Sequence, residues 1–186
     1  MKFHCIVSVL LAATLAAGCT NDGDHSSVGF GTTSFANGRI KVSDNAATVH
    51  VKGAPQAVIG TSGSLQIGHD VIATNPAQQA LLRDYYRHAA AVREHGIATG
   101  KAGAAVAGQA ISSVAKGLAS GNTDNIDQEI DAKAARVELE ARKICLDLVG
   151  VKAAQDALAA QLPAFNPYAH VIDASATSDC KTIEKP

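Results

Sequence analysis

Four cysteines carry the most reactive side chains of this 186-residue chain: Cys5, Cys19, Cys145 and Cys180. A thiol can be acylated, can pair with a second thiol or, as a thiolate, can bind a metal. The sequence around each cysteine indicates which of these reactions to expect. The first two lie close to an apolar run, Ile6–Ala17, and the other two lie far from it.

The residues before Cys19 read Leu15-Ala16-Ala17-Gly18, after a start that carries Lys2 and an apolar stretch too short to span a bilayer. Leu-Ala-Ala-Gly-Cys resembles a bacterial lipobox, the signal for cleavage before the cysteine and for acylation of its sulfur and amine. We therefore expect residues 1–18 to be a lipoprotein signal peptide and Cys19 to be the lipidation site. The alternatives are an uncleaved hydrophobic N-terminus and a plain secretory signal that is cut elsewhere.

Acylation of Cys19 would determine where the protein resides. One acyl chain anchors a protein marginally, whereas two or more anchor it stably. Thr20 stands where the usual signal for retention in the inner membrane has an aspartate. We expect a lipid anchor in the outer membrane of the cell envelope, facing the periplasm, with residues 19–37 as a polar, flexible tether.

The two remaining cysteines are expected to form a disulfide. Removal of Cys5 with the signal peptide and acylation of Cys19 leave Cys145 and Cys180. In an oxidising compartment two spare thiols favour a bridge. It would close a loop of about 36 residues and contribute roughly 4 kcal/mol on the chain-entropy estimate. The alternative is two free thiols.

Patterns for catalysis or metal binding are weak. Gly60-Thr61-Ser62-Gly63-Ser64 lacks the second glycine of a Gly-x-Ser-x-Gly nucleophile elbow. His88 and His95 share a helical face, but seven residues separate them by roughly 10.5 Å along the axis, too far to bind one ion directly. A solvated helix face explains His88 beside Asp84. We predict no catalytic residue, no metal site and no cofactor, and we do not expect an enzyme.

Charge and aromatic content restrict the choice of partner. The net charge is −1 and both signs are scattered along the chain, so a nucleic acid is not expected as partner. Tyr85, Tyr86 and Arg87 are the best candidates for a contact surface. Packing of the two tyrosines on a sheet, with Arg87 in water, is the favoured interpretation.

Period-two alternation predicts strands over residues 38–74. Ile40 and Val42 alternate with polar residues, as do Val49 and Val51. Turn signals rich in glycine separate these runs. The segment therefore predicts an antiparallel β-meander of about five short strands, whose apolar face needs a cover.

Residues 75–162 are expected to form a helical region. Asn75, Pro76 and Gln78 occupy the N-cap, first helical and capping-box positions. In residues 97–121, 17 of the 25 residues are Gly, Ala, Ser or Thr. We favour a small-residue helix pressed against its neighbours. The alternative is a glycine-zipper element that enters a membrane, although its charge-free stretch, 102–115, is shorter than the approximately 20 residues of a span.

A second patterned helix is predicted from residue 126. Its apolar residues are spaced close to a heptad, so it should lie along another helix: Ile126, Ile130, Ala134, Val137, Ala141, Ile144 and Leu148. Gly150 predicts a break or kink. Residues 163–186 are expected to be an irregular C-terminal tail that the disulfide holds.

Together these elements predict an α+β fold, an antiparallel meander packed against an antiparallel helical hairpin. The stretches 63–72 and 78–85, the second with Gln-x-x-Leu-Leu-x-x-Tyr, resemble the YggN-like family of Gram-negative envelope proteins. The resemblance covers roughly residues 38–150, with Gly68-His69 in place of an Asp-Gly turn. It implies a periplasmic setting and this fold, and it implies no catalytic residues because the family has no established function.

The expected function is therefore that of a non-enzymatic envelope lipoprotein, a structural or interaction module. Its partners would be the membrane, through the N-terminal anchor, and an envelope protein or a second copy of the chain. One alternative is a lipoprotein that binds a small apolar or lipid-like ligand, which predicts a closed apolar cavity above about 300 Å³ between sheet and helices. The other is a glycine-zipper membrane-associated protein.

Overall fold

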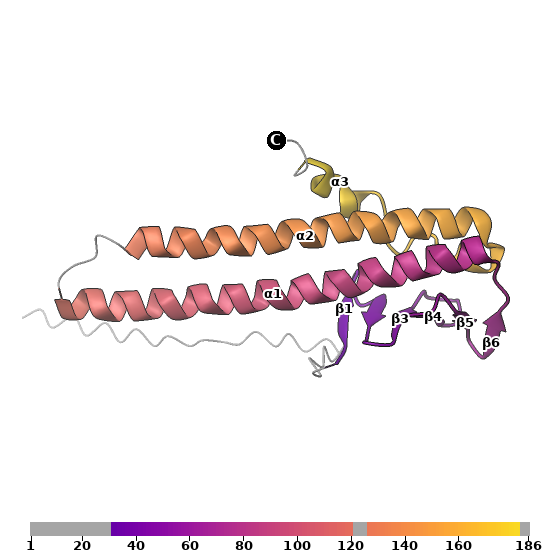
Figure 1. The fold of residues 1–186 in the computed structure, drawn as a ribbon, viewed down its shortest axis with the longest axis horizontal. Coiled ribbons are helices and arrows are strands. Elements are labelled where there is room, and N and C mark those ends of the chain that lie inside the picture. Colours follow the sequence, from indigo (N-terminus) through magenta and orange to yellow (C-terminus); the bar gives the residue numbers. More distant parts are fainter. Residues whose placement is uncertain (1–30, 121–125, 183–186) are drawn as a thin grey trace, which may run out of the picture.

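The computed structural model describes residues 31–120 and 126–182. A six-stranded sheet precedes two long helices that pack as a hairpin, which confirms the predicted α+β fold (Figure 1). The elements in chain order are β1 (Thr33–Phe35), β2 (Ile40–Val42), β3 (Ala46–Val49), β4 (Ala57–Gly60), β5 (Leu65–Ile67), β6 (Asp70–Ile72), α1 (Pro76–Ser120), α2 (Ile126–Gln161), the 3-10 helix η1 (Pro163–Tyr168) and α3 (Ser175–Thr182).

The sheet is a simple antiparallel meander in which every strand pairs with the next one along the chain. Its register brings alternate apolar residues to one face, since Ile40 lies opposite Val49 and Ala47 lies opposite Ile59. All four of these side chains are fully buried. The apolar residues of the period-two pattern therefore form the buried face of a sheet that is covered on one side.

The sheet has six strands where the sequence predicted about five. The additional strand, β1, lies within the segment expected as a tether, and it pairs with β2 with Thr33 opposite Val42. A tight turn through Ala36, Asn37 and Gly38, all with positive φ, returns the chain into β2. A strand of three residues in a polar, glycine-rich stretch has too little alternation to be recognised from the sequence.

Helix α1 begins where the capping residues predicted. The backbone N–H of Gln78 donates to Asn75 Oδ1 (2.9 Å), and the backbone N–H of Asn75 donates to Gln78 Oε1 (3.0 Å). This reciprocal pair is a capping box. One face of the following turns is buried against the sheet, with Leu82, Tyr85 and Ala89 fully enclosed.

The main core lies between the sheet, the first part of α1 and the last part of α2. The ring of Tyr85 packs edge-on to Phe165, with centroids 6.0 Å apart, and Phe165 packs against Tyr168. The Tyr168 hydroxyl donates to Pro55 O (2.5 Å), which ties η1 to the sheet. Buried Gln155 donates its amide to Ala169 O and Ile172 O and accepts from Ile172 N, so the segment after η1 is fixed as well.

The C-terminal region is more regular than the predicted irregular tail. It contains η1 and α3, and Asp173 caps α3 by accepting hydrogen bonds from the Ser175 hydroxyl (2.6 Å) and the Ala176 N–H (2.9 Å). These two bonds, the Ser175 bond first, hold the pKa of Asp173 below its usual range. The carboxylate of Asp173 thus satisfies a backbone N–H at the start of α3, which stabilises this helix of eight residues beside α2.

Beyond the sheet, the two helices continue as a projection that we call the distal arm, residues 97–120 of α1 and 126–143 of α2 (Figure 1). Of its residues whose side chains the structure describes, Ser113 alone is buried. A side chain at Gly100, Gly103 or Gly108 would meet nothing within 4 Å. The predicted small-residue helix is present and packs along α2, but its glycines at 100, 103 and 108 do not contribute to that packing.

Candidate functional site

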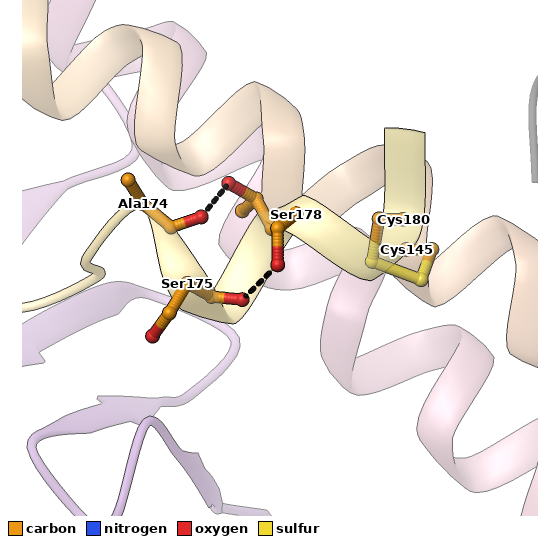
Figure 2. The surroundings of a disulfide bond; sticks show 6 residues. Cys145, Ala174, Ser175, Ser178 and Cys180 are labelled. Carbon is orange, nitrogen blue, oxygen red and sulfur yellow. Dashed lines mark hydrogen bonds between the residues drawn. A yellow bond between two sulfur atoms is a disulfide. The ribbon is translucent and has the colours of Figure 1, made fainter. Parts of the chain in front are cut away.

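The predicted disulfide is present and joins α2 to α3. Cys145 and Cys180 are bonded, with Cα atoms 5.1 Å apart and a sequence separation of 35 residues (Figure 2). Within α3 the Ser178 hydroxyl donates to Ser175 O (2.8 Å), as Figure 2 shows. The bridge fastens the C-terminal helix to the middle of α2. Cys19, the predicted lipidation site, lies outside the described residues.

Next to the disulfide, a row of ionisable side chains connects the two long helices. We call it the inter-helix ladder: His88 and His95 from α1, and Glu140, Lys143 and Asp147 from α2. His88 Nδ1 lies 3.1 Å from Asp147 Oδ1, and His95 Nδ1 lies 3.1 Å from Glu140 Oε2. His95 Nε2 also lies 3.6 Å from Asp147 Oδ2. The carboxylate of Asp147 therefore lies between the two imidazoles, a connection that was not predicted from the sequence.

His95 lies between two carboxylates of α2. Its Nδ1 faces Glu140 and its Nε2 faces Asp147. Lys143 continues the row, since its Nζ lies 2.9 Å from Glu140 Oε1.

The Glu140 carboxylate is the group whose acidity the ladder changes. Its hydrogen bond from Lys143 is the largest reason that the pKa of Glu140 lies below its usual range. Burial opposes this effect, and the hydrogen bond from His95 adds to it. The charged form of Glu140 is thus favoured in the folded protein.

Gly150 makes room for the ladder. A Cβ at this position would lie 2.5 Å from Cγ and Nδ1 of His88. Helix α2 runs through Gly150 without interruption from Ile126 to Gln161, so the predicted break or kink there is wrong. The glycine serves close approach of an imidazole to the helix backbone, a use of glycine that requires no bend.

The predicted heptad contact along α2 is present in part. Ala134, Val137, Ile144 and Leu148 are half-buried, whereas Ala141 is exposed. Ile126 and Ile130 lie outside the residues whose side chains the structure describes. The ladder joins the helices beside this apolar line. Sequence reasoning missed the ladder, yet a signal existed, since His88 and His95 are seven residues apart and so are Glu140 and Asp147.

A cavity of about 360 Å³ opens between α1 and α2 in the distal arm. Three alanines and three charged side chains line it: Ala98, Lys101, Ala102, Ala105, Arg136 and Glu140. Lys101 and Arg136 form no ion pair with any residue that the structure describes. The space between sheet and helices, where a ligand cavity was considered, holds a continuous cluster of buried side chains.

The other sequence candidates lie apart from the ladder. Residues 60–64 form a turn, in which the backbone N–H of Gly63 donates to Gly60 O. Tyr85 is fully buried, Tyr86 donates its hydroxyl to Asp44 O (2.7 Å), and Arg87 pairs with Asp84 at the surface. The favoured interpretation of these aromatic residues, packing on the sheet, is confirmed.

Residues 31–120 and 126–182 contain neither a metal-binding cluster nor a helix that could cross a membrane. No set of three or more His, Cys, Asp or Glu side chains is arranged to hold a metal ion. None of the helices there combines the length and the apolar character that crossing a membrane requires.

No family model matches the chain, and neither the curated proteins nor the solved structures include a similar one. The resemblance to the YggN-like family therefore stays a prediction.

Proposed function

We propose that this protein is a non-enzymatic lipoprotein of the cell envelope that presents its helical hairpin to a partner. The observation that carries the proposal is the division of the molecule into two unlike parts. One end has a filled core beneath a sheet, whereas the distal arm extends beyond it with Ser113 as the sole described buried residue. An extended arm with bare faces suits contact with another molecule and offers little enclosure for catalysis.

The location rests on two features. Leu15-Ala16-Ala17-Gly18-Cys19 provides a lipidation signal, and the Cys145–Cys180 bridge suits an oxidising compartment. Both agree with a periplasmic setting at the outer membrane. The chain between Cys19 and β1 would then connect the anchor to the sheet end of the molecule.

Fractionation of cells tests this proposal. Wild-type chain should pellet with outer membranes and dissolve in detergent, whereas a Cys19→Ala variant should leave this fraction. Cys180→Ala serves as matched control because it removes a cysteine without touching the lipobox. Wild-type chain in the cytosol would contradict the proposal.

A second candidate function is binding of an anionic amphiphile in the cavity of the distal arm. The observation that favours it is a pair of cations, Lys101 and Arg136, that form no ion pair with the described residues and lie beside three alanines. A short apolar chain would contact the alanines, and its acidic head group would neutralise the cations. Titration with a fluorescent fatty acid tests it, and equal affinities of wild type and Arg136→Ala would contradict it. Lys41, exposed in β2 on the sheet, provides the control substitution Lys41→Ala.

A further inference from the structure

One face of the distal arm carries a repeat that no described part of the chain covers. We call it the outer seam: Ile97, Lys101, Ala104, Gly108, Ile111 and Ala115 of α1. All six residues are exposed, Ile97 by 43% and Ile111 by 73%. Their spacing is 4, 3, 4, 3, 4, which keeps one line of residues facing a second helix that packs alongside. Helix α2 is not that second helix, because it contacts the face of α1 that carries His88 and His95. Lys101, which also lines the cavity between α1 and α2, lies at the edge of the seam nearer to α2.

The small residues of the seam have no role within the described chain. A Cβ at Gly108 would meet nothing within 4 Å, and an internal glycine costs about 1 kcal/mol relative to alanine in a helix. Close approach of another helix backbone would use the space that Gly108 leaves. Two large exposed isoleucines on the same line would then lose their contact with water.

The order of large and small residues fits a second copy of the same chain. If two copies of α1 run antiparallel about a two-fold axis between Ala104 and Gly108, each Ala104 faces the other copy's Gly108. In this register Ile97 faces Ala115, and Ile111 faces Lys101. Each isoleucine thus meets a small residue or an aliphatic stem, so the face complements itself as an isologous interface requires.

We propose that two copies of this protein associate antiparallel through the outer seam. The proposal deepens the proposed function and rests on it for its setting, because it names the partner that the arm contacts. The two Lys101 side chains would not oppose each other, since ten residues of helix separate them by roughly 15 Å, more than a Debye length of about 8 Å. A lysine on the seam suits this pairing better than burial in a bilayer.

The sheet leaves room for such a partner. It lies against one end of α1, on the side away from α2 (Figure 1). Among the described residues, Arg93 is the last one of α1 whose side chain hydrogen-bonds to the sheet region, since it donates to Asp44 Oδ1 (2.8 Å) in the turn between β2 and β3. In the antiparallel register, residues 76–93 of one copy, which carry its sheet, lie beyond residue 118 of the other copy. The sheet of each copy would therefore lie outside the region where the two seams pair.

Sedimentation equilibrium of the full chain in density-matched mild detergent tests the proposal. We expect twice the chain mass for wild type and weaker association of Gly108→Leu by roughly ten- to a hundredfold, because the added side chain blocks close approach. Gly103→Leu is the matched control, since its Cβ also meets open space but lies off the seam. Monomeric wild type, or equal association of the wild-type and Gly108→Leu chains, would overturn the proposal.

Crosslinking tests the register. Co-expressed Ala104→Cys and Gly108→Cys chains should form a mixed disulfide, whereas Ala104→Cys alone should not crosslink. Crosslinking of Ala104→Cys with itself would indicate parallel helices and would contradict the antiparallel pair. A monomer that carries acylated Cys19 would refute the association and leave the anchor intact, whereas a dimer with unmodified Cys19 would do the reverse.

Discussion

The imidazole of His88 occupies the space in which a side chain at Gly150 would stand, since a Cβ there would lie 2.5 Å from the ring. This contact fixes the distance between α1 and α2 at the point where the ladder begins. It also explains a glycine in the interior of a helix of 36 residues. Beyond the apolar core that they share at the sheet end, the two helices are thus held by this close contact and by charged side chains.

The first prediction concerns this contact. Gly150→Ala should destabilise the protein by about 1–3 kcal/mol, because the methyl group overlaps His88. Gly100→Ala, on an exposed helical position where a Cβ meets nothing, should stabilise it by about 1 kcal/mol. Urea unfolding measures both changes.

A second substitution separates this overlap from other effects. In a His88→Ala background the methyl group at position 150 no longer meets a ring, so Gly150→Ala should lose most of its cost. If Gly150→Ala stabilised the wild-type chain as much as Gly100→Ala does, the close contact would not exist in solution.

The second prediction compares two buried tyrosines. Tyr85 is fully buried, its hydroxyl has no hydrogen-bond partner among the described residues, and burial raises its pKa above the usual range. Tyr85→Phe should therefore be neutral or stabilising. Tyr168→Phe removes the hydrogen bond to Pro55 O and should cost about 1 kcal/mol. Free energies of unfolding of the two variants test this prediction. An equal loss of stability in both variants would show that the Tyr85 hydroxyl has a hydrogen-bond partner.

The third prediction concerns acid. Because the pKa of Glu140 is lower in the folded than in the unfolded state, its contribution to stability is present above the unfolded pKa and is lost as the pH falls through the folded pKa. Glu140→Gln should thus flatten the acid side of the curve of stability against pH. Glu138→Gln, on an exposed position of the same helix, should leave that side unchanged. Superimposable curves for wild type and Glu140→Gln would refute this role.

The fourth prediction concerns the bridge between α2 and α3. Replacing Cys145 and Cys180 by alanine should lower the free energy of unfolding by about 4 kcal/mol, since the unfolded chain loses its crosslink. A reducing agent should destabilise wild type and leave the double variant unchanged. Two reactive thiols at Cys145 and Cys180 after denaturation of the native product would contradict the bridge.

Features that depend on residues close together in the sequence, or on simple counts, were predicted correctly. The capping box at Asn75 and Gln78 acts within one turn, so its residues alone predicted where α1 begins. The disulfide followed from counting thiols, because two of the four had other expected fates. The buried faces of β2 and β3 followed from alternation.

Features that depend on how two helices align could not be read in the same way. The pairing of His88 with Asp147 depends on how far α1 and α2 are shifted along each other. This shift is not encoded in any local sequence pattern. Gly150 was interpreted as a break because a helix-breaking glycine and a glycine that receives a ring look alike in sequence. The glycines of residues 97–121 suggested tight packing within the chain, whereas the three that the structure describes, Gly100, Gly103 and Gly108, face open space.

Intact mass spectrometry of the protein purified from membranes determines whether Cys19 is the lipidated N-terminus. We expect a chain that starts at Cys19, is acylated there and contains the Cys145–Cys180 disulfide. A chain that retains Met1, or one that starts at an unmodified Cys19, would contradict this expectation.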